Sequence, residues 1–267
     1  MTTAKEFVNN LVASNDALFK ASQMQVKAYF ESQPSKEELV DHFTGRMVNE
    51  RMNLVEISKK IAELPADTSV TELQLLSKQA LDESIHYKLV KEVIEHMTGE
   101  EVDLQAAVDS WETRITSKGA SLIEKYNAHN DEIALALYQT IAEGRAEAVW
   151  NQMAECIEDK FISNAYAKIA KDEGFHSKIG ARKLEQLAQD EATQARVQSL
   201  VERMRKDLYD ISCKNTVAAE AGITLAFQLP AGVLLAGKGL VAIGVAGKLF
   251  TKFFGLKTEE VNVEEAK

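Results

Sequence analysis

Two short segments of this chain carry a glutamate and a histidine three residues apart, Glu83-x-x-His86 and Glu173-x-x-His176. Residues at this spacing project from one face of a helix, so each pair could offer a carboxylate oxygen and an imidazole nitrogen to a metal ion. A single such pair is weak evidence, because an exposed pair on a polar helix face has the same spacing. Two copies, each with a helix upstream, predict a site for two metal ions.

The helix upstream of the first pair contributes a third candidate. Between residues 34 and 64 the apolar residues recur every three or four positions, and Glu50 takes the place of one of them. A carboxylate on the buried face of a helix costs free energy unless it is paired or binds a metal. Glu50 is therefore a candidate ligand, whereas Glu56 lies off this line and is expected on the solvent face.

The helix upstream of the second pair offers two candidates. A helix expected over residues 131–157 places both Glu143 and Glu147 on its inner line. The separation of Glu143 from the following Glu-x-x-His pair is closer to the separation found in the first half of the chain. Glu143 is therefore the preferred ligand, and Glu147 is the alternative or an additional carboxylate beside the metals.

The types of donor indicate which metals such a site would take. Carboxylate oxygens are hard ligands and imidazole nitrogens are borderline, which suits iron or manganese better than a metal that prefers thiolates. Carboxylates can also bridge two cations, and Glu83 and Glu173 are the expected bridging pair. The expected ligand set is Glu50, Glu83, His86, Glu143, Glu173 and His176.

This arrangement resembles the metal site of the ferritin-like superfamily, where two helices each supply a Glu and two others each supply a Glu-x-x-His pair. An aspartate precedes each pair, and the Asp-Glu-x-x-His form is similar to that of ribonucleotide reductase small subunits and multicomponent monooxygenase hydroxylases. The resemblance covers about residues 34–189. It implies that Asp82 orients His176 and that Asp172 orients His86.

The resemblance implies a non-haem di-iron oxygenase or oxidase that uses O2 to oxidise a small or apolar organic substrate, with manganese as an alternative metal. Hydroxylation, N-oxygenation, desaturation and carbon–carbon cleavage all stay open. No flavin or iron–sulfur motif is visible, so the electrons would come from a separate donor or from the substrate. The alternatives are a ferroxidase or other iron-handling protein, and a non-catalytic scaffold subunit of an oxygenase.

The same patterns predict the fold class. Only three prolines and few alternating apolar runs predict an all-α chain. The resemblance implies a ferritin-like four-helix bundle, and flanking helices are expected over residues 4–33 and 101–126. No motif surrounds the remaining histidines, which are expected to be solvated or at the boundary of the core: His42, His96 and His129.

Composition limits the partners and the compartment. The net charge of −10 and the isoelectric point near 5.2 argue against nucleic acid as a partner. Cys156 and Cys213 are too few for a disulfide framework, and the first residues lack the apolar core of a signal peptide. We therefore expect a cytoplasmic protein.

The C-terminal part of the sequence differs from the rest. The expected domains are a helical bundle over residues 1–220, an apolar glycine-rich segment over 221–256 and an acidic tail over 257–267. Three interpretations of the apolar segment stay open. It could pack as buried helices, lie on a membrane as a peripheral contact, or form a self-association surface such as that of a homodimer.

Overall fold

The computed structural model describes residues 2–117, 122–126, 128 and 130–213, and only the backbone of residues 112–117, 124 and 210–213. The chain divides into two compact units, Met1–Ser212 and Cys213–Lys267. The described part is helical and contains no strand, which confirms the predicted all-α class. The expectations for residues 221–267 and for His129 lie outside the described residues.

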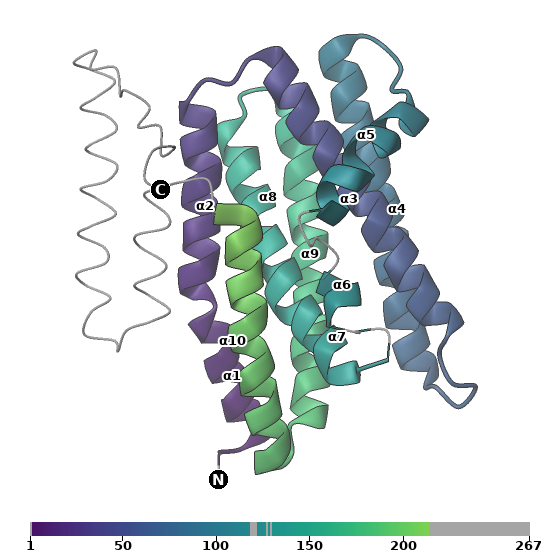
Figure 1. Cartoon of the computed structure of the whole chain (residues 1–267), viewed down its shortest axis with the longest axis vertical. Coiled ribbons are helices and arrows are strands. Elements are labelled where there is room, and N and C mark those ends of the chain that lie inside the picture. The colour runs from purple at the N-terminus through teal and green to yellow at the C-terminus, as the bar shows by residue number, and fades with distance from the viewer. Residues whose placement is uncertain (1, 118–121, 127, 129, 214–267) are drawn as a thin grey trace, which may run out of the picture. The chain divides into compact units, whose positions relative to one another are not determined.

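The helices follow one another in the order that Figure 1 shows. Their bounds are α1 Ala4–Ser14, α2 Asp16–Glu31, α3 Lys36–Ala62, α4 Val70–Thr98, α5 Leu104–Ser117, α6 Leu122–Lys125, α7 Glu132–Tyr138, η1 Gln139–Glu143, α8 Gly144–Cys156, α9 Lys160–Leu187 and α10 Glu191–Cys213.

Local sequence signals fix the ends of the long helices. Ser35 begins α3 with a capping box, in which its hydroxyl accepts from the Glu38 N–H and the Glu38 carboxylate accepts from the Ser35 N–H. Asp159 caps the start of α9 in a similar way. At the end of α4, Gly99 takes a left-handed conformation with a φ of 77°, which glycine adopts without strain.

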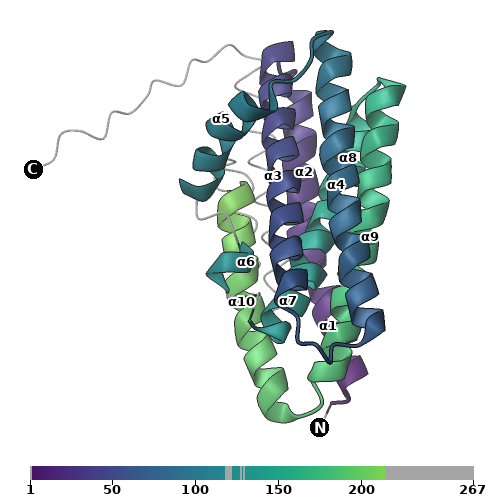
Figure 2. The same cartoon turned by 90° about the vertical axis from the view of Figure 1, so that its right-hand side faces the viewer.

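The helices that carry the candidate ligands pack in two pairs. α3 runs along α4, α8 runs along α9, and α4 also contacts α9 (Figure 2). A single apolar core joins all four helices and includes Phe43 and Met47 of α3, Val90 and Val93 of α4, Val149 and Trp150 of α8, and Tyr166 and Ile169 of α9. This core determines the height and rotation at which each helix presents its polar residues.

The expected helix over residues 4–33 is interrupted, so that prediction was wrong. α1 ends before Asn15, whose buried side chain accepts a hydrogen bond from Arg205 Nε at 2.7 Å. Arg205 also donates to the Leu11 carbonyl, and the Asn15 N–H bonds to Val12 instead of continuing the α-helical ladder. A side chain from α10 therefore causes the break between α1 and α2.

The expected helix over residues 131–157 is also not uniform. Between α7 and α8 the five residues of η1 form a π-helix, all of them buried. Here α9 comes very close, since a Cβ on Gly180 would lie 2.5 Å from the Ala136 carbonyl and 2.7 Å from the Thr140 nitrogen. Such single π-turns are frequent at functional sites, and this one ends at the candidate ligand Glu143.

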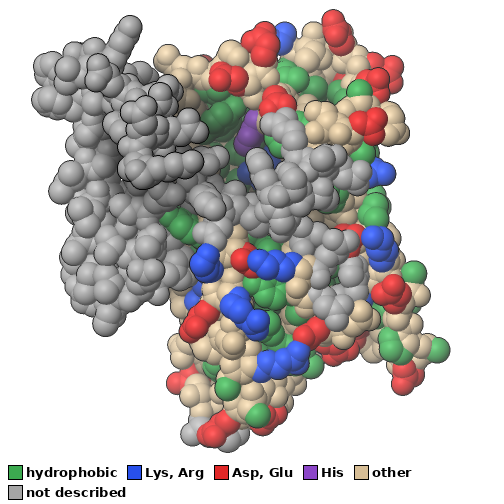
Figure 3. Space-filling model, in the orientation of Figure 1, with side chains coloured by type: hydrophobic (Ala, Val, Ile, Leu, Met, Phe, Trp, Pro, Cys, Tyr) green, Lys and Arg blue, Asp and Glu red, His purple; other side chains and the backbone are tan. Residues whose placement is uncertain are grey.

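The outer helices complete the described part. The expected helix over residues 101–126 is two helices, α5 and α6, with residues 118–121 outside the description. Over α10, the face in Figure 3 mixes basic and acidic side chains with apolar ones between them. In the described part of the chain, no helix is long and apolar enough to cross a membrane.

Candidate metal centre

The six candidate ligands meet inside the bundle. They form two overlapping groups, and in each group the donor atoms lie within 4.8 Å of one another. We call Glu50, Glu83, His86 and Glu173 the first half-site, and Glu83, Glu143, Glu173 and His176 the second half-site. Each of the six residues is at most 2% exposed.

Glu83 and Glu173 belong to both half-sites. In the first, His86 Nδ1 lies 3.4 Å from Glu50 and 3.5 Å from Glu173. In the second, His176 Nδ1 lies 3.5 Å from Glu83 Oε1. The two shared carboxylates therefore lie between the imidazoles, where bridging ligands of a dinuclear centre would have to be.

The aspartates occupy the crossed positions that the resemblance implies. His176 Nε2 lies 3.1 Å from Asp82, and His86 Nε2 lies 3.4 Å from Asp172. A proton on Nε2 that is donated to the aspartate leaves Nδ1 with a lone pair pointing at the other donors. Each aspartate thus fixes the orientation of the histidine that belongs to the other half of the sequence.

Sequence reasoning missed the residues that hold Glu143. Gln79 Nε2 donates to Glu143 Oε1 at 3.2 Å, and Gln139 Nε2 donates to Gln79 Oε1 at 2.8 Å. Both amides are buried, and Gln79 lies one helical turn before Glu83 on the same face of α4. That spacing could have revealed it, because a glutamine on a buried helix face needs a polar partner.

The donor set fits a pair of metal ions because several of its atoms have no other partner. Glu50 Oε2, both carboxylate oxygens of Glu83 and His86 Nδ1 are fully buried and make no hydrogen bond. Buried polar atoms are nearly always satisfied, and leaving one unsatisfied costs about 1–3 kcal/mol. Two cations among four carboxylates and two imidazoles would satisfy all of them and balance the charge of the carboxylates.

The pKa values of the metal-free site also indicate that the donor set fits a pair of metal ions. Burial, together with the neighbouring Glu143 and Glu50 carboxylates, raises the pKa of Glu83 to about 8. Burial and the Glu143 charge likewise raise the pKa of Glu173 well above its usual range. Burial opposes the charged form of His86, but the hydrogen bond to Asp172 and the nearby Glu50 and Glu83 carboxylates raise its pKa overall. Without metal, these carboxylates can coexist only by retaining protons.

Glu147, the alternative ligand, does not join either half-site. It is half-buried, and its carboxylate packs over Gly174 of α9, where an added Cβ would lie 2.5 Å from Glu147 Oε1. The chain therefore brings Glu143, and not Glu147, to the other donors. That Glu143 binds a metal stays a prediction.

Glu56 does not lie where the sequence predicted, and His42 lines a cavity that the sequence did not predict. Glu56 was expected on the solvent face but is buried, with its carboxylate 2.8 Å from Lys59 Nζ. It faces a cavity that the helical wheel of α3 alone does not show. His42 is half-buried at the core boundary, as expected, but it lines the same cavity, and His96 is exposed beside Asp159.

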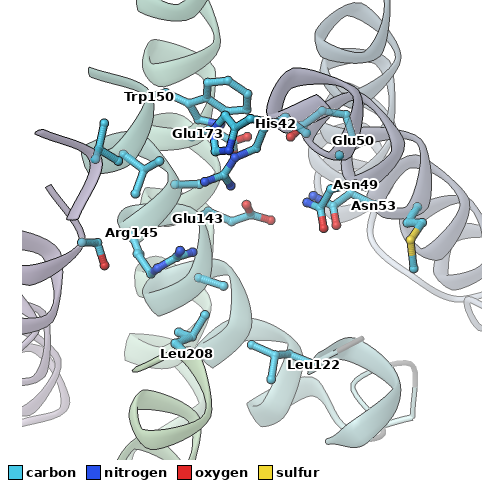
Figure 4. Close-up of a pocket in the computed structure, with 18 of the residues that line it drawn as sticks. His42, Asn49, Glu50, Asn53, Leu122, Glu143, Arg145, Trp150, Glu173 and Leu208 are labelled. Carbon is cyan, nitrogen blue, oxygen red and sulfur yellow. The ribbon is translucent and has the colours of Figure 1, made fainter. Parts of the chain in front are cut away.

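That cavity has a volume of about 410 Å³ and reaches the carboxylate cluster from one side. Figure 4 shows Asn49, Glu50 and Asn53 projecting into it from α3, opposite Glu143 and Arg145. Leu122 of α6 and Leu208 of α10 lie at its lower end in that view. Three of the candidate ligands line it, namely Glu50, Glu143 and Glu173.

No family model, no curated protein and no solved structure matches this chain. The interpretation of the site therefore depends on its own residues and their geometry.

Proposed function

We propose that this chain is a non-haem di-iron oxygenase or oxidase with a ferritin-like bundle. The observation that carries the proposal is the convergence of six buried donors from four helices beside a cavity of small-molecule size. One Glu from each of two elements and a Glu-x-x-His pair from each of two others is the ligand pattern of that superfamily. In this chain α3 and η1 supply the first kind, and α4 and α9 supply the second.

When bound, the two ions would supply the reduction of O2 and the oxidising equivalents that the substrate receives. The chain's own task is positioning. Glu83 and Glu173 would hold both ions at a fixed separation, and His86 and His176 would each complete one half-site. Asp82 keeps the tautomer of its histidine fixed through a hydrogen bond.

The protein also separates the centre from bulk water. All six ligands are buried, so a reactive species at the centre would meet the substrate rather than solvent. The cavity offers the substrate one route to the centre, along the side formed by Glu50, Glu143 and Glu173. This cavity favours substrate oxidation over iron handling, which requires no space for an organic molecule.

The test is anaerobic loading with ferrous iron, followed by exposure to O2 and absorption spectroscopy. We expect about two iron ions per chain and a transient visible band that decays faster when a substrate is present. Fewer than about one ion per chain would favour a scaffold subunit. Iron oxidation that no organic compound accelerates, in a hollow multi-subunit shell, would favour a ferroxidase. In the proposed enzyme a separate electron donor would return the centre to the ferrous state.

A further inference from the structure

One positive charge on the cavity wall, that of Arg46, forms no ion pair with any residue that the structure describes. Arg46 lies on α3, one helical turn before Glu50, and lines the cavity. Its guanidinium makes no hydrogen bond and no ion pair with any residue that the structure describes. It lies over the ring face of Trp150, at 5.6 Å from Cζ to the centroid, and it also interacts electrostatically with the Glu50 carboxylate.

An arginine in this position is unusual. A guanidinium has five N–H donors, and one that is withdrawn from bulk water normally forms a fork with a carboxylate or phosphate. The Glu50 carboxylate is one turn away, but in a metal-loaded centre its charge would be taken up by the cations. The charge of Arg46 then remains for an anion that enters the cavity.

The rest of the cavity wall indicates what the anion would be attached to. Asn49 and Asn53 extend the polar strip of α3, and Glu143 and Arg145 lie opposite it, whereas much of the remaining wall is apolar or aromatic. The apolar part includes Val26, Phe30, Trp111, Ile123 and Trp150. A ligand that complements both parts has one charged end and an apolar body.

We propose that the cavity binds an organic acid whose carboxylate pairs with Arg46 and whose apolar body lies against Trp111 and Trp150. This inference rests on the proposed function and names its substrate class, a monocarboxylic acid. A single unpaired guanidinium matches a single negative charge, and its planar fork matches a carboxylate. Because Arg46 is one turn from Glu50, the acid end of the molecule would be held beside the metal centre.

The binding of an acid in this cavity can be tested with the protein's own tryptophans. It contains two tryptophans, Trp111 and Trp150, and both line the cavity. Tryptophan fluorescence therefore detects a ligand in the cavity without any turnover. The probes are octanoate and its neutral isostere octanamide, titrated into both metal-free and iron-loaded protein under anaerobic conditions.

We expect octanoate to bind about tenfold or more tightly than octanamide, as a charge-assisted hydrogen bond requires. Arg46→Gln should abolish this preference while leaving octanamide binding unchanged, and Arg46→Lys should keep part of it. The matched control is Arg182→Gln, an exposed arginine of α9 outside the cavity wall, which should keep the full preference. Circular dichroism establishes that each variant is folded.

Equal affinity for octanoate and octanamide in the wild-type protein would overturn the inference, as would an undiminished preference in Arg46→Gln. Displacement of octanoate by inorganic phosphate at lower concentration would assign the cavity to phosphate and overturn it as well. The outcomes are separable from those of the proposed function. Protein that binds about two irons but shows no preference for the acid refutes only the substrate class. Protein that prefers the acid but binds no metal refutes only the di-iron centre.

Discussion

In one half of the centre, Asp82 lies 3.1 Å from His176 and holds Lys78 through both carboxylate oxygens, at 2.6 and 2.8 Å. In the other half, Asp172 lies 3.4 Å from its histidine and 4.0 Å from Lys168. The Asp82 side chain is 5% exposed and that of Asp172 is 21% exposed. The same local motif thus yields a tighter and a looser aspartate–histidine pair, because the bundle buries the two aspartates to different depths.

Glu143 and Glu50, the glutamates upstream of the two Glu-x-x-His pairs, also differ in how firmly neighbouring residues hold them. Glu143, at the end of a π-turn, is held by the Gln79 amide, whereas Glu50 sits on a regular α-helix with one buried oxygen that has no hydrogen bond. The second half-site is therefore fixed by the protein before any metal binds. The first half-site has fewer supports, because no hydrogen bond from a neighbouring amide of the described chain holds Glu50.

The largest expected effect comes from removing a ligand that both half-sites share. Glu83→Ala should reduce metal loading from about two ions to fewer than one per chain, since neither half-site keeps its set of donors. Helical content should persist, because the core of the bundle is apolar and does not include Glu83. Elemental analysis with circular dichroism measures both quantities. Glu147→Ala is the control, and unchanged loading in Glu83→Ala would refute the site.

Because Asp82 and Asp172 differ in burial and in distance to their histidines, their substitution should reduce metal affinity to different extents. Removing a group that orients a metal-binding histidine typically costs about 10–100-fold in metal affinity. We expect Asp82→Asn to approach the upper end of this range and Asp172→Asn the lower end, because Asp82 is closer to its histidine and more deeply buried. Competition titration with a chelator measures the affinities. Equal losses, or a larger loss for Asp172→Asn, would show that the two halves are equivalent in solution.

Two glycines of α9 test how closely the second half is packed. A Cβ on Gly180 would collide with the backbone of Ala136 and Thr140, whereas the nearest atoms to a Cβ on Gly174 belong to the flexible Glu147 carboxylate. Gly180→Ala should lower the free energy of unfolding by about 1–3 kcal/mol, and Gly174→Ala should change it by less than about 1 kcal/mol. Urea unfolding measures both, and the reverse order would contradict the close approach of α9 to η1.

The stability of the protein should depend on pH differently with and without metal. The unfolded pKa of a glutamate is 4.5, and burial raises that of Glu83 to about 8 in the folded chain. Between these values the folded state keeps a proton that the unfolded state releases, so metal-free stability should fall as the pH rises through this window. The raised pKa of His86 acts in the same direction.

A slope of about 1 kcal/mol per pH unit is expected for one retained proton. Urea unfolding of chelator-treated protein at pH of about 6 and 7 measures it, and Glu83→Gln should have a smaller slope. Iron-loaded protein should not lose stability over this range, because the cations replace the protons. Metal-free stability that increases with pH would contradict the burial of these carboxylates in their protonated form.

The two Glu-x-x-His pairs and Glu50 could be predicted from the sequence, because their positions follow the helical period. Glu83-x-x-His86 and its counterpart are local, and the gap that Glu50 fills in an apolar series needs only the helical period. The lysine four residues before each aspartate, Lys78 and Lys168, was equally readable, yet sequence reasoning overlooked it. The exclusion of Glu147 was not readable, because it depends on a π-turn that shifts the phase of the helix.

The sequence by itself determined the helical class, the six residues with the right chemistry and the crossed aspartate–histidine pairs that the resemblance implied. The helical class and the six residues follow from periodicity and residue type, and the crossed pairs follow only from the resemblance. Only the tertiary structure decided which carboxylates converge, that Gln79 supports Glu143, and that Glu56, His42 and Arg46 face one cavity. Those properties arise where helices distant in the sequence pack together, and no spacing within a single helix encodes them.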